Sequence, residues 1–175
     1  VYLTSPANPG GRALDTKPFE ELLSALPDHV TVIVDEAYAD FATRDGALQA
    51  ARCVQWTDQL IVLRSLSKLH GLAGLRIGYA IASRDRARVL ERAAPAFPIV
   101  RGAAEVALAA LSDREHEKRV IDHVVAARTQ LEQRLDAKRI DRLASDGPFV
   151  LAADPDASGP RVFDRYVMLP AWVER

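Results

Sequence analysis

The fold is decided by a continuous β-branched run, Val30-Thr31-Val32-Ile33-Val34, which ends at Asp35. An apolar run without polar alternation is typical of a strand that is buried on both faces of a parallel sheet. Similar runs occur at Leu60-Ile61-Val62-Leu63 and Ile77-Gly78-Tyr79-Ala80-Ile81-Ala82. Shorter strand candidates are Val1-Tyr2-Leu3-Thr4 and Phe149-Val150-Leu151-Ala152.

Amphipathic segments separate or follow these runs. Helical spacing of apolar residues predicts helices over 16–26, 84–94, 101–111 and 115–138. Short buried strands that alternate with helices are typical of layered α/β proteins. The sequence therefore predicts an α/β fold with a mostly parallel sheet flanked by helices.

Composition excludes several classes of protein. The chain has 175 residues, and 23 Lys+Arg against 24 Asp+Glu leave a formal net charge of −1. A nucleic-acid binder needs a basic excess or a dense basic patch, which this balance argues against. No apolar run approaches the roughly 18 residues that suggest a membrane span. We therefore expect no nucleic-acid or membrane partner. The single Cys53 cannot form an internal disulfide, so we expect a reducing, cytoplasmic location.

Polar residues follow the predicted strands at their carboxyl ends, which is where ligands bind in open α/β sheets. The set combines an amide, a carboxylate, a phenol, two hydroxyls, a lysine and an arginine. Its members are Asn8, Asp35, Tyr38, Ser65, Ser67, Lys68 and Arg76. This set fits pyridoxal phosphate (PLP), whose aldehyde needs an amine, whose pyridine nitrogen needs a carboxylate and whose phosphate needs hydrogen-bond donors.

Three segments carry a family resemblance: Ser5-Pro6-Ala7-Asn8-Pro9-Gly10-Gly11, Val34-Asp35-Glu36-Ala37-Tyr38, and the run from Ser65 to Tyr79, SLSKLHGLAGLRIGY. In this order they resemble the signatures of fold-type I PLP-dependent aminotransferases, and within these the histidinol-phosphate aminotransferases. The resemblance covers roughly the first half of the chain. It implies a PLP-binding large domain over 1–113, a long connecting helix over 114–146 and part of a small C-terminal α/β domain over 147–175.

The resemblance also implies a role for each residue at the strand ends. Lys68 would form the Schiff base with PLP and move a proton at the substrate, and Asp35 would pair with the pyridine nitrogen. Asn8 and Tyr38 would hydrogen-bond the ring oxygen.

The remaining residues would bind anionic groups. Ser65, Ser67 and Arg76 would hold the cofactor phosphate, as the same resemblance implies. Arg165 and Arg175 are candidates for contacts with the substrate carboxylate. No metal site is expected.

The implied reaction moves an amino group between histidinol phosphate, or a related donor, and 2-oxoglutarate, as a step of histidine biosynthesis. Aromatic amino acid aminotransferases and threonine-phosphate decarboxylases share the motifs and stay open as alternatives. Family members are homodimers, so a homodimer is expected. The family's chain is about twice as long and contains a glycine-rich loop upstream of Asn8, so we expect a chain truncated at its N-terminus.

Two functions of other classes also fit parts of the sequence. The stretch Val32-Ile33-Val34-Asp35-Glu36 has the form of a Walker B element of an NTPase, although the chain lacks the matching phosphate-binding loop. The chain could also be a PLP-fold piece that binds cofactor or dimerises without catalysis.

Overall fold

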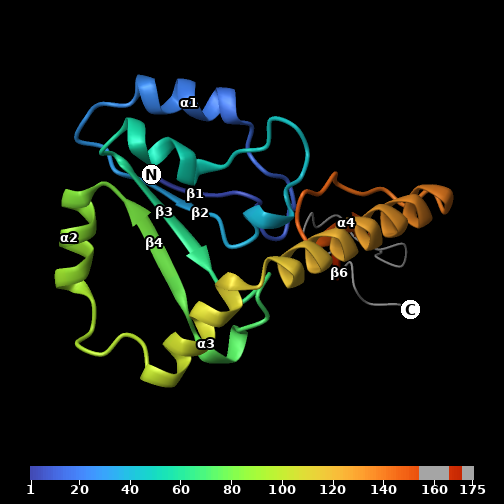
Figure 1. Ribbon diagram of the computed structural model, residues 1–175. Coiled ribbons are helices and arrows are strands. Elements are labelled where there is room, and N and C mark those ends of the chain that lie inside the picture. Colours follow the sequence, from blue (N-terminus) through green and yellow to red (C-terminus); the bar gives the residue numbers. More distant parts are fainter. Residues whose placement is uncertain (154–165, 171–175) are drawn as a thin grey trace.

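The computed structural model describes residues 1–153 and 166–170. Its main sheet has the strand order β1-β2-β3-β4. These strands are β1 (Tyr2–Thr4), β2 (Val32–Asp35), β3 (Leu60–Ser65) and β4 (Gly78–Ala82). β1, β2 and β3 pair in parallel, and β4 runs antiparallel to β3, which confirms the mostly parallel sheet (Figure 1).

The strand register brings the carboxyl ends of three strands to one edge. Thr4 pairs with Asp35, and Asp35 pairs with Leu63. The segments that leave β1, β2 and β3 therefore start side by side.

One face of the sheet is covered by α1 (Thr16–Ala25) and by a 3-10 helix, η2 (Ala50–Trp56), as Figure 1 shows. The sequence did not predict η2, because its seven residues are too few to show helical periodicity. The core between these layers consists of buried side chains from both, namely Phe19, Val32, Val34, Leu48, Ala50, Cys53, Leu60 and Val62.

Three predicted helices follow the sheet in order. They are α2 (Arg84–Ala93), α3 (Arg101–Ser112) and α4 (Arg114–Ala137). α4 extends away from the sheet beyond the strand ends (Figure 1). Val124 of α4 packs there against Phe41 and Leu69. Phe41 belongs to η1 (Ala39–Phe41), and a further short 3-10 helix is η3 (Ala73–Leu75).

A second, two-stranded sheet lies beside α4. β5 (Phe149–Ala153) matches the predicted strand, and it pairs antiparallel with β6 (Tyr166–Pro170). The sequence did not predict β6, because its apolar run Val167-Met168-Leu169 is too short to show a strand pattern and ends at Pro170. Val150 and Ala152 of β5 pack on Leu135 of α4. Among the described residues, no helix is both long and apolar enough to cross a membrane.

Candidate active site

The predicted site residues from the first two motifs meet the lysine at one edge of the sheet. Asn8 Nδ2 donates to the Tyr38 hydroxyl at 3.4 Å. Lys68 Nζ lies 5.0 Å from the centroid of the Tyr38 ring, within the range of a cation–π contact. The structure therefore brings together an amide, a phenol and an amine that are far apart in the sequence. Tyr38 lies 30 positions after Asn8, and Lys68 lies 30 positions after Tyr38.

Asp35 is the last residue of β2 and is partly buried. Its Oδ1 accepts the backbone N–H of Ala37 at 3.0 Å, and its Oδ2 accepts the hydroxyl of Tyr2 at 3.0 Å. The bond to Ala37 forms a local turn, and no α-helix begins at Glu36. The carboxylate thus lies at the carboxyl end of the strand, as predicted.

The predicted phosphate-binding residues lie on two adjoining segments. Ser65 ends β3, and its Oγ accepts the N–H of Ser67 at 3.1 Å. The Leu66 N–H donates to the Ile77 carbonyl at 3.1 Å. Because Ile77 directly follows Arg76, this bond holds the Arg76 segment against the serine turn. Arg76 itself is exposed, has a φ of +55° and donates through Nη1 to the Ala73 carbonyl at 2.9 Å. The structure thus places Arg76 near the serine turn, with its guanidinium bonded to its own loop.

A buried ion-pair network lies directly behind this edge, and the sequence did not reveal it. Glu36 is fully buried, and its Oε2 accepts Arg64 Nη1 at 3.0 Å while its Oε1 accepts the Ala50 N–H at 2.5 Å. Arg64 also pairs with Asp40. Burial raises the pKa of Glu36, and the hydrogen bond from Ala50 and the charge of Arg64 offset only part of that rise. Glu36 directly follows Asp35 and Arg64 directly precedes Ser65, but the two residues pair across 28 positions, so no local pattern in the sequence signals the contact.

The loop that carries Asn8 is attached to the segment after α4. The Gly11 carbonyl accepts the N–H groups of Asp146 at 2.7 Å and Gly147 at 3.1 Å. Asp146 is buried, and its Oδ2 accepts the Ala13 N–H at 2.9 Å and Arg44 Nε at 3.0 Å. These bonds fix the position of the Asn8 loop relative to the start of the second sheet.

The second sheet also reaches the site. Phe149, the first residue of β5, lies edge-on against Tyr38, with ring centroids 5.3 Å apart and an interplanar angle of 88°. Tyr38 therefore lies between the Lys68 amine and a buried aromatic ring of a different sheet.

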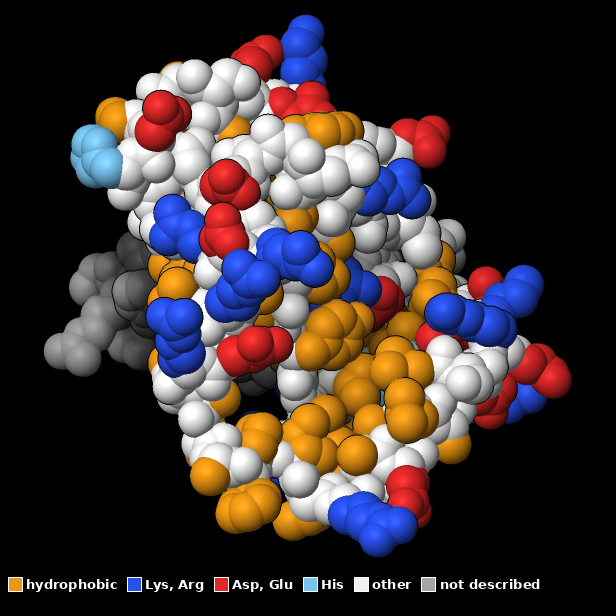
Figure 2. All heavy atoms as spheres, turned by 60° about the vertical axis from the view of Figure 1, so that its left-hand side comes forward, with side chains coloured by type: hydrophobic (Ala, Val, Ile, Leu, Met, Phe, Trp, Pro, Cys, Tyr) orange, Lys and Arg blue, Asp and Glu red, His pale blue; other side chains and the backbone are white. Residues whose placement is uncertain are grey.

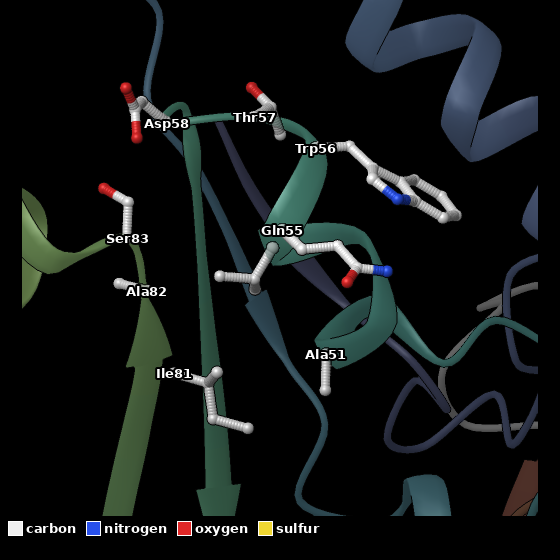
Figure 3. Close-up of a pocket in the computed structure, with 9 residues that line it drawn as sticks. Ala51, Gln55, Trp56, Thr57, Asp58, Ile81, Ala82 and Ser83 are labelled. Atoms are coloured by element: carbon white, nitrogen blue, oxygen red, sulfur yellow. The ribbon is translucent and has the colours of Figure 1, made fainter.

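Two hollows lie near the main sheet. A polar cavity of about 460 Å³ adjoins Ser65 and is bounded by β3, α3 and the start of α4. A second hollow of about 550 Å³ lies between η2 and the end of β4, where Ser83 and Asp58 line it (Figure 3). Because the end of β4 pairs with the start of β3, this second hollow is at the opposite end of the sheet from Lys68. The first hollow shares Ser65 with the site, and the second is separate from it.

Arg165 and Arg175, the predicted contacts for the substrate carboxylate, lie outside the described residues.

Comparisons with known proteins identify relatives of this chain. The family model "Aminotransferase class I and II" matches residues 1–169. The chain is 35% identical over 151 residues to the histidinol-phosphate aminotransferase of Akkermansia muciniphila, covering 86% of this chain and 41% of the relative. It is 33% identical over 156 residues to the aromatic amino acid aminotransferase of Cutibacterium acnes, covering 89% of this chain and 44% of the relative.

A solved structure shares the fold. The histidinol-phosphate aminotransferase of Sinorhizobium meliloti, determined in complex with pyridoxal-5'-phosphate, superposes with a TM-score of 0.85 at 24% identity, covering 97% of this chain and 52% of that chain. The chain thus spans less than half the length of the curated relatives named above and about half of this structure. The match rejects the NTPase reading, because it runs through all three motifs and the sheet that carries them. The chain belongs to the class I and II aminotransferase family.

Proposed function

We propose that the protein is a PLP-dependent aminotransferase that transfers the amino group of histidinol phosphate to 2-oxoglutarate. The observation that carries the proposal is the meeting of Asn8, Tyr38 and Lys68 at the edge of the sheet where Asp35 ends β2. The relatives' names support the choice of amino donor.

The chemistry of the donor set fits PLP. Asp35 retains free lone pairs on both carboxylate oxygens and would accept the pyridine N–H. Asn8 and Tyr38 would donate to the ring oxygen. Ser65, Ser67 and Arg76 would bind the phosphate once the Arg76 guanidinium turns from the Ala73 carbonyl. Arg165 and Arg175 are proposed to contact the substrate carboxylate.

The chain's own residues would handle the proton. When bound, PLP supplies an electron sink for the charge that develops at the substrate α-carbon. Lys68 Nζ would take the proton from that carbon and release it to the bound cofactor during transfer of the amino group. The Tyr38 ring, 5.0 Å from Nζ, would keep the amine near this position. Asp35 would keep the pyridine nitrogen protonated.

The cofactor part of the proposal is tested by reduction. The complete protein encoded by the gene is incubated with PLP and treated with borohydride, and the modified peptide is mapped. We expect one adduct, on Lys68, that is absent from Lys68→Ala and retained in Lys17→Ala, which changes an exposed lysine of α1. An unmodified Lys68 in the wild-type protein would reject PLP as the cofactor.

The donor is tested by a screen with 2-oxoglutarate as acceptor. Histidinol phosphate should give the highest kcat/KM. Turnover of phenylalanine or tyrosine instead would favour the second function, aromatic amino acid transamination, which the Cutibacterium acnes relative suggests. An adduct on Lys68 without turnover of any donor would favour a protein that binds PLP without catalysis.

We also propose a cytoplasmic homodimer with the domain division 1–113, 114–146 and 147–175. Large apolar side chains are exposed around α2 and α3, namely Val89, Leu90, Phe97, Ile99, Val100, Val106 and Leu108. Figure 2 shows hydrophobic side chains gathered on this side of the molecule. An apolar surface of this kind is suited to contact with further protein. Light scattering of the complete protein should give twice the chain mass, and a monomer mass at all concentrations would contradict the dimer.

A further inference from the structure

Tyr2 and Asp35 lie on neighbouring parallel strands and share one face of the sheet. The register sets Tyr2 opposite Ile33, and side chains two positions apart on a strand point to the same side. Asp35 is therefore the next residue along on the face of Tyr2. The Tyr2 hydroxyl covers this distance and donates to Asp35 Oδ2 at 3.0 Å. β1 and β2 lie side by side in Figure 1.

The hydrogen bond from Tyr2 helps to fix the orientation of the Asp35 carboxylate. Asp35 Oδ1 accepts the Ala37 N–H at 3.0 Å, so each carboxylate oxygen accepts one hydrogen bond and the plane of the group is set. An ionised carboxylate offers about four lone-pair sites. Each oxygen of Asp35 therefore keeps an acceptor position for a third donor. Tyr2 orients this group without competing for the remaining sites.

We propose that Tyr2 is a positioning residue that holds the Asp35 carboxylate in the orientation needed to accept the pyridine N–H of PLP. The inference rests on the proposed function, in which Asp35 is the partner of that nitrogen. Tyr2 acts through Asp35 and touches no reacting atom. Among the described residues, Tyr2 is the side chain that donates a hydrogen bond to Asp35. Without it, the Ala37 N–H alone would hold the carboxylate, and Oδ2 could turn toward water.

The state of the phenol suits this role. The hydrogen bond to Asp35, with smaller effects of burial and of the Asp35 charge, raises the pKa of Tyr2 above its ordinary value of 10.0. The hydroxyl therefore stays protonated and able to donate across the neutral range.

The first test measures the affinity for PLP in the complete protein by absorbance titration. Tyr2→Phe keeps the ring and removes the hydroxyl, and we expect the dissociation constant for PLP to rise roughly threefold to tenfold, the scale of one ordinary hydrogen bond. Tyr79→Phe is the matched control, because Tyr79 is 43% exposed, comparable to Tyr2 at 57%, and lies on the far strand of the sheet. Tyr79→Phe should bind PLP as wild type does. Wild-type affinity in Tyr2→Phe would overturn the inference.

The second test asks whether Tyr2 acts through Asp35. The affinity for PLP is compared in Asp35→Asn with and without Tyr2→Phe. A positioning role predicts that Tyr2→Phe causes little further loss once the carboxylate is gone. If the two losses add in full, Tyr2 acts on the fold in general and the inference is wrong.

The third test needs no cofactor. The Tyr2 phenol is titrated by NMR in cofactor-free protein carrying labelled tyrosine, with its signal assigned by its loss in Tyr2→Phe. Asp35→Asn should lower the phenol pKa toward 10.0, and an unchanged value would show that the hydrogen bond does not form. The two proposals fail in different ways. Wild-type protein that forms no adduct with PLP rejects the proposed function, whereas tight binding by both wild type and Tyr2→Phe rejects only the role of Tyr2.

Discussion

Glu36 and Arg64 form an ion pair that links the carboxyl ends of two neighbouring strands, β2 and β3. Glu36 follows Asp35, Arg64 precedes Ser65, and Arg64 Nη1 lies 3.0 Å from Glu36 Oε2. The Glu36 side chain is fully buried, and that of Arg64 is 15% exposed. The pair therefore fixes the ends of β2 and β3 relative to each other at the point where both deliver a site residue.

Loss of Arg64 should destabilise the protein severely. Arg64→Met leaves the Glu36 carboxylate buried without its cation, and breaking a buried pair in this way costs about 3–5 kcal/mol. Urea unfolding should show this loss, and the double variant Glu36→Gln, Arg64→Met should recover part of it. The control is Arg88→Met, which breaks an exposed pair with Asp85 and should cost less than about 1 kcal/mol. Equal effects of Arg64→Met and Arg88→Met would contradict the structural role of the pair.

Glu36 should also make the stability depend on pH in a defined direction. Burial raises its pKa in the folded protein above the ordinary 4.5, so the folded state holds the proton more tightly than the unfolded chain. The stabilisation from this group is then complete below pH 4.5 and is lost as pH rises through the folded-state pKa. The Glu36→Gln variant lacks this titration, so the stability of wild type relative to it should fall as the pH rises above 4.5. A relative stability that rises with pH in this range would contradict the prediction. Glu21→Gln, which changes an exposed glutamate of α1, serves as the control.

The sequence predicted the strands of the main sheet and the edge that carries Asp35 and Ser65, because both follow from local patterns. The runs that became β2 and β3 are apolar over their whole length, and each is followed at once by polar residues. The ion pair could not be predicted in the same way, since Glu36 meets Ala50 and Arg64, which are 14 and 28 positions away. The tie between Gly11 and Ser145 spans 134 positions. These contacts depend on how η2 and the segment after α4 pack, and no local pattern encodes that packing.

Gly11 is the glycine of the Asn8 loop that should tolerate no side chain. Its φ is +78°, and a Cβ there would lie 2.3 Å from Ser145 Oγ and 2.7 Å from Ser145 Cβ. Gly11→Ala should lower the free energy of unfolding by about 2 kcal/mol or more, from the strained backbone and the clash together. The neighbouring Gly10→Ala is the control, because a Cβ at Gly10 meets nothing within 4 Å. Gly10→Ala should stay within about 0.5 kcal/mol of wild type. Similar midpoints for the two variants in urea unfolding would show that the loop does not pack against Ser145 as described.

Phe149 joins the second sheet to the site, because its ring packs edge-on against Tyr38, which also contacts the Lys68 amine. Phe149 is 3% exposed, so truncation leaves a cavity at this junction. Phe149→Ala should cost about 3–5 kcal/mol in urea unfolding, and Phe149→Leu, which refills part of the space, should cost less. Phe97→Ala provides the matched control, since Phe97 is 92% exposed and its removal should change stability by about 0.5 kcal/mol at most. Equal losses for Phe149→Ala and Phe97→Ala would mean that β5 is not packed on the site. The expected order, with Phe149→Ala lowest, would instead show that Tyr38 takes part of its support from outside the main sheet.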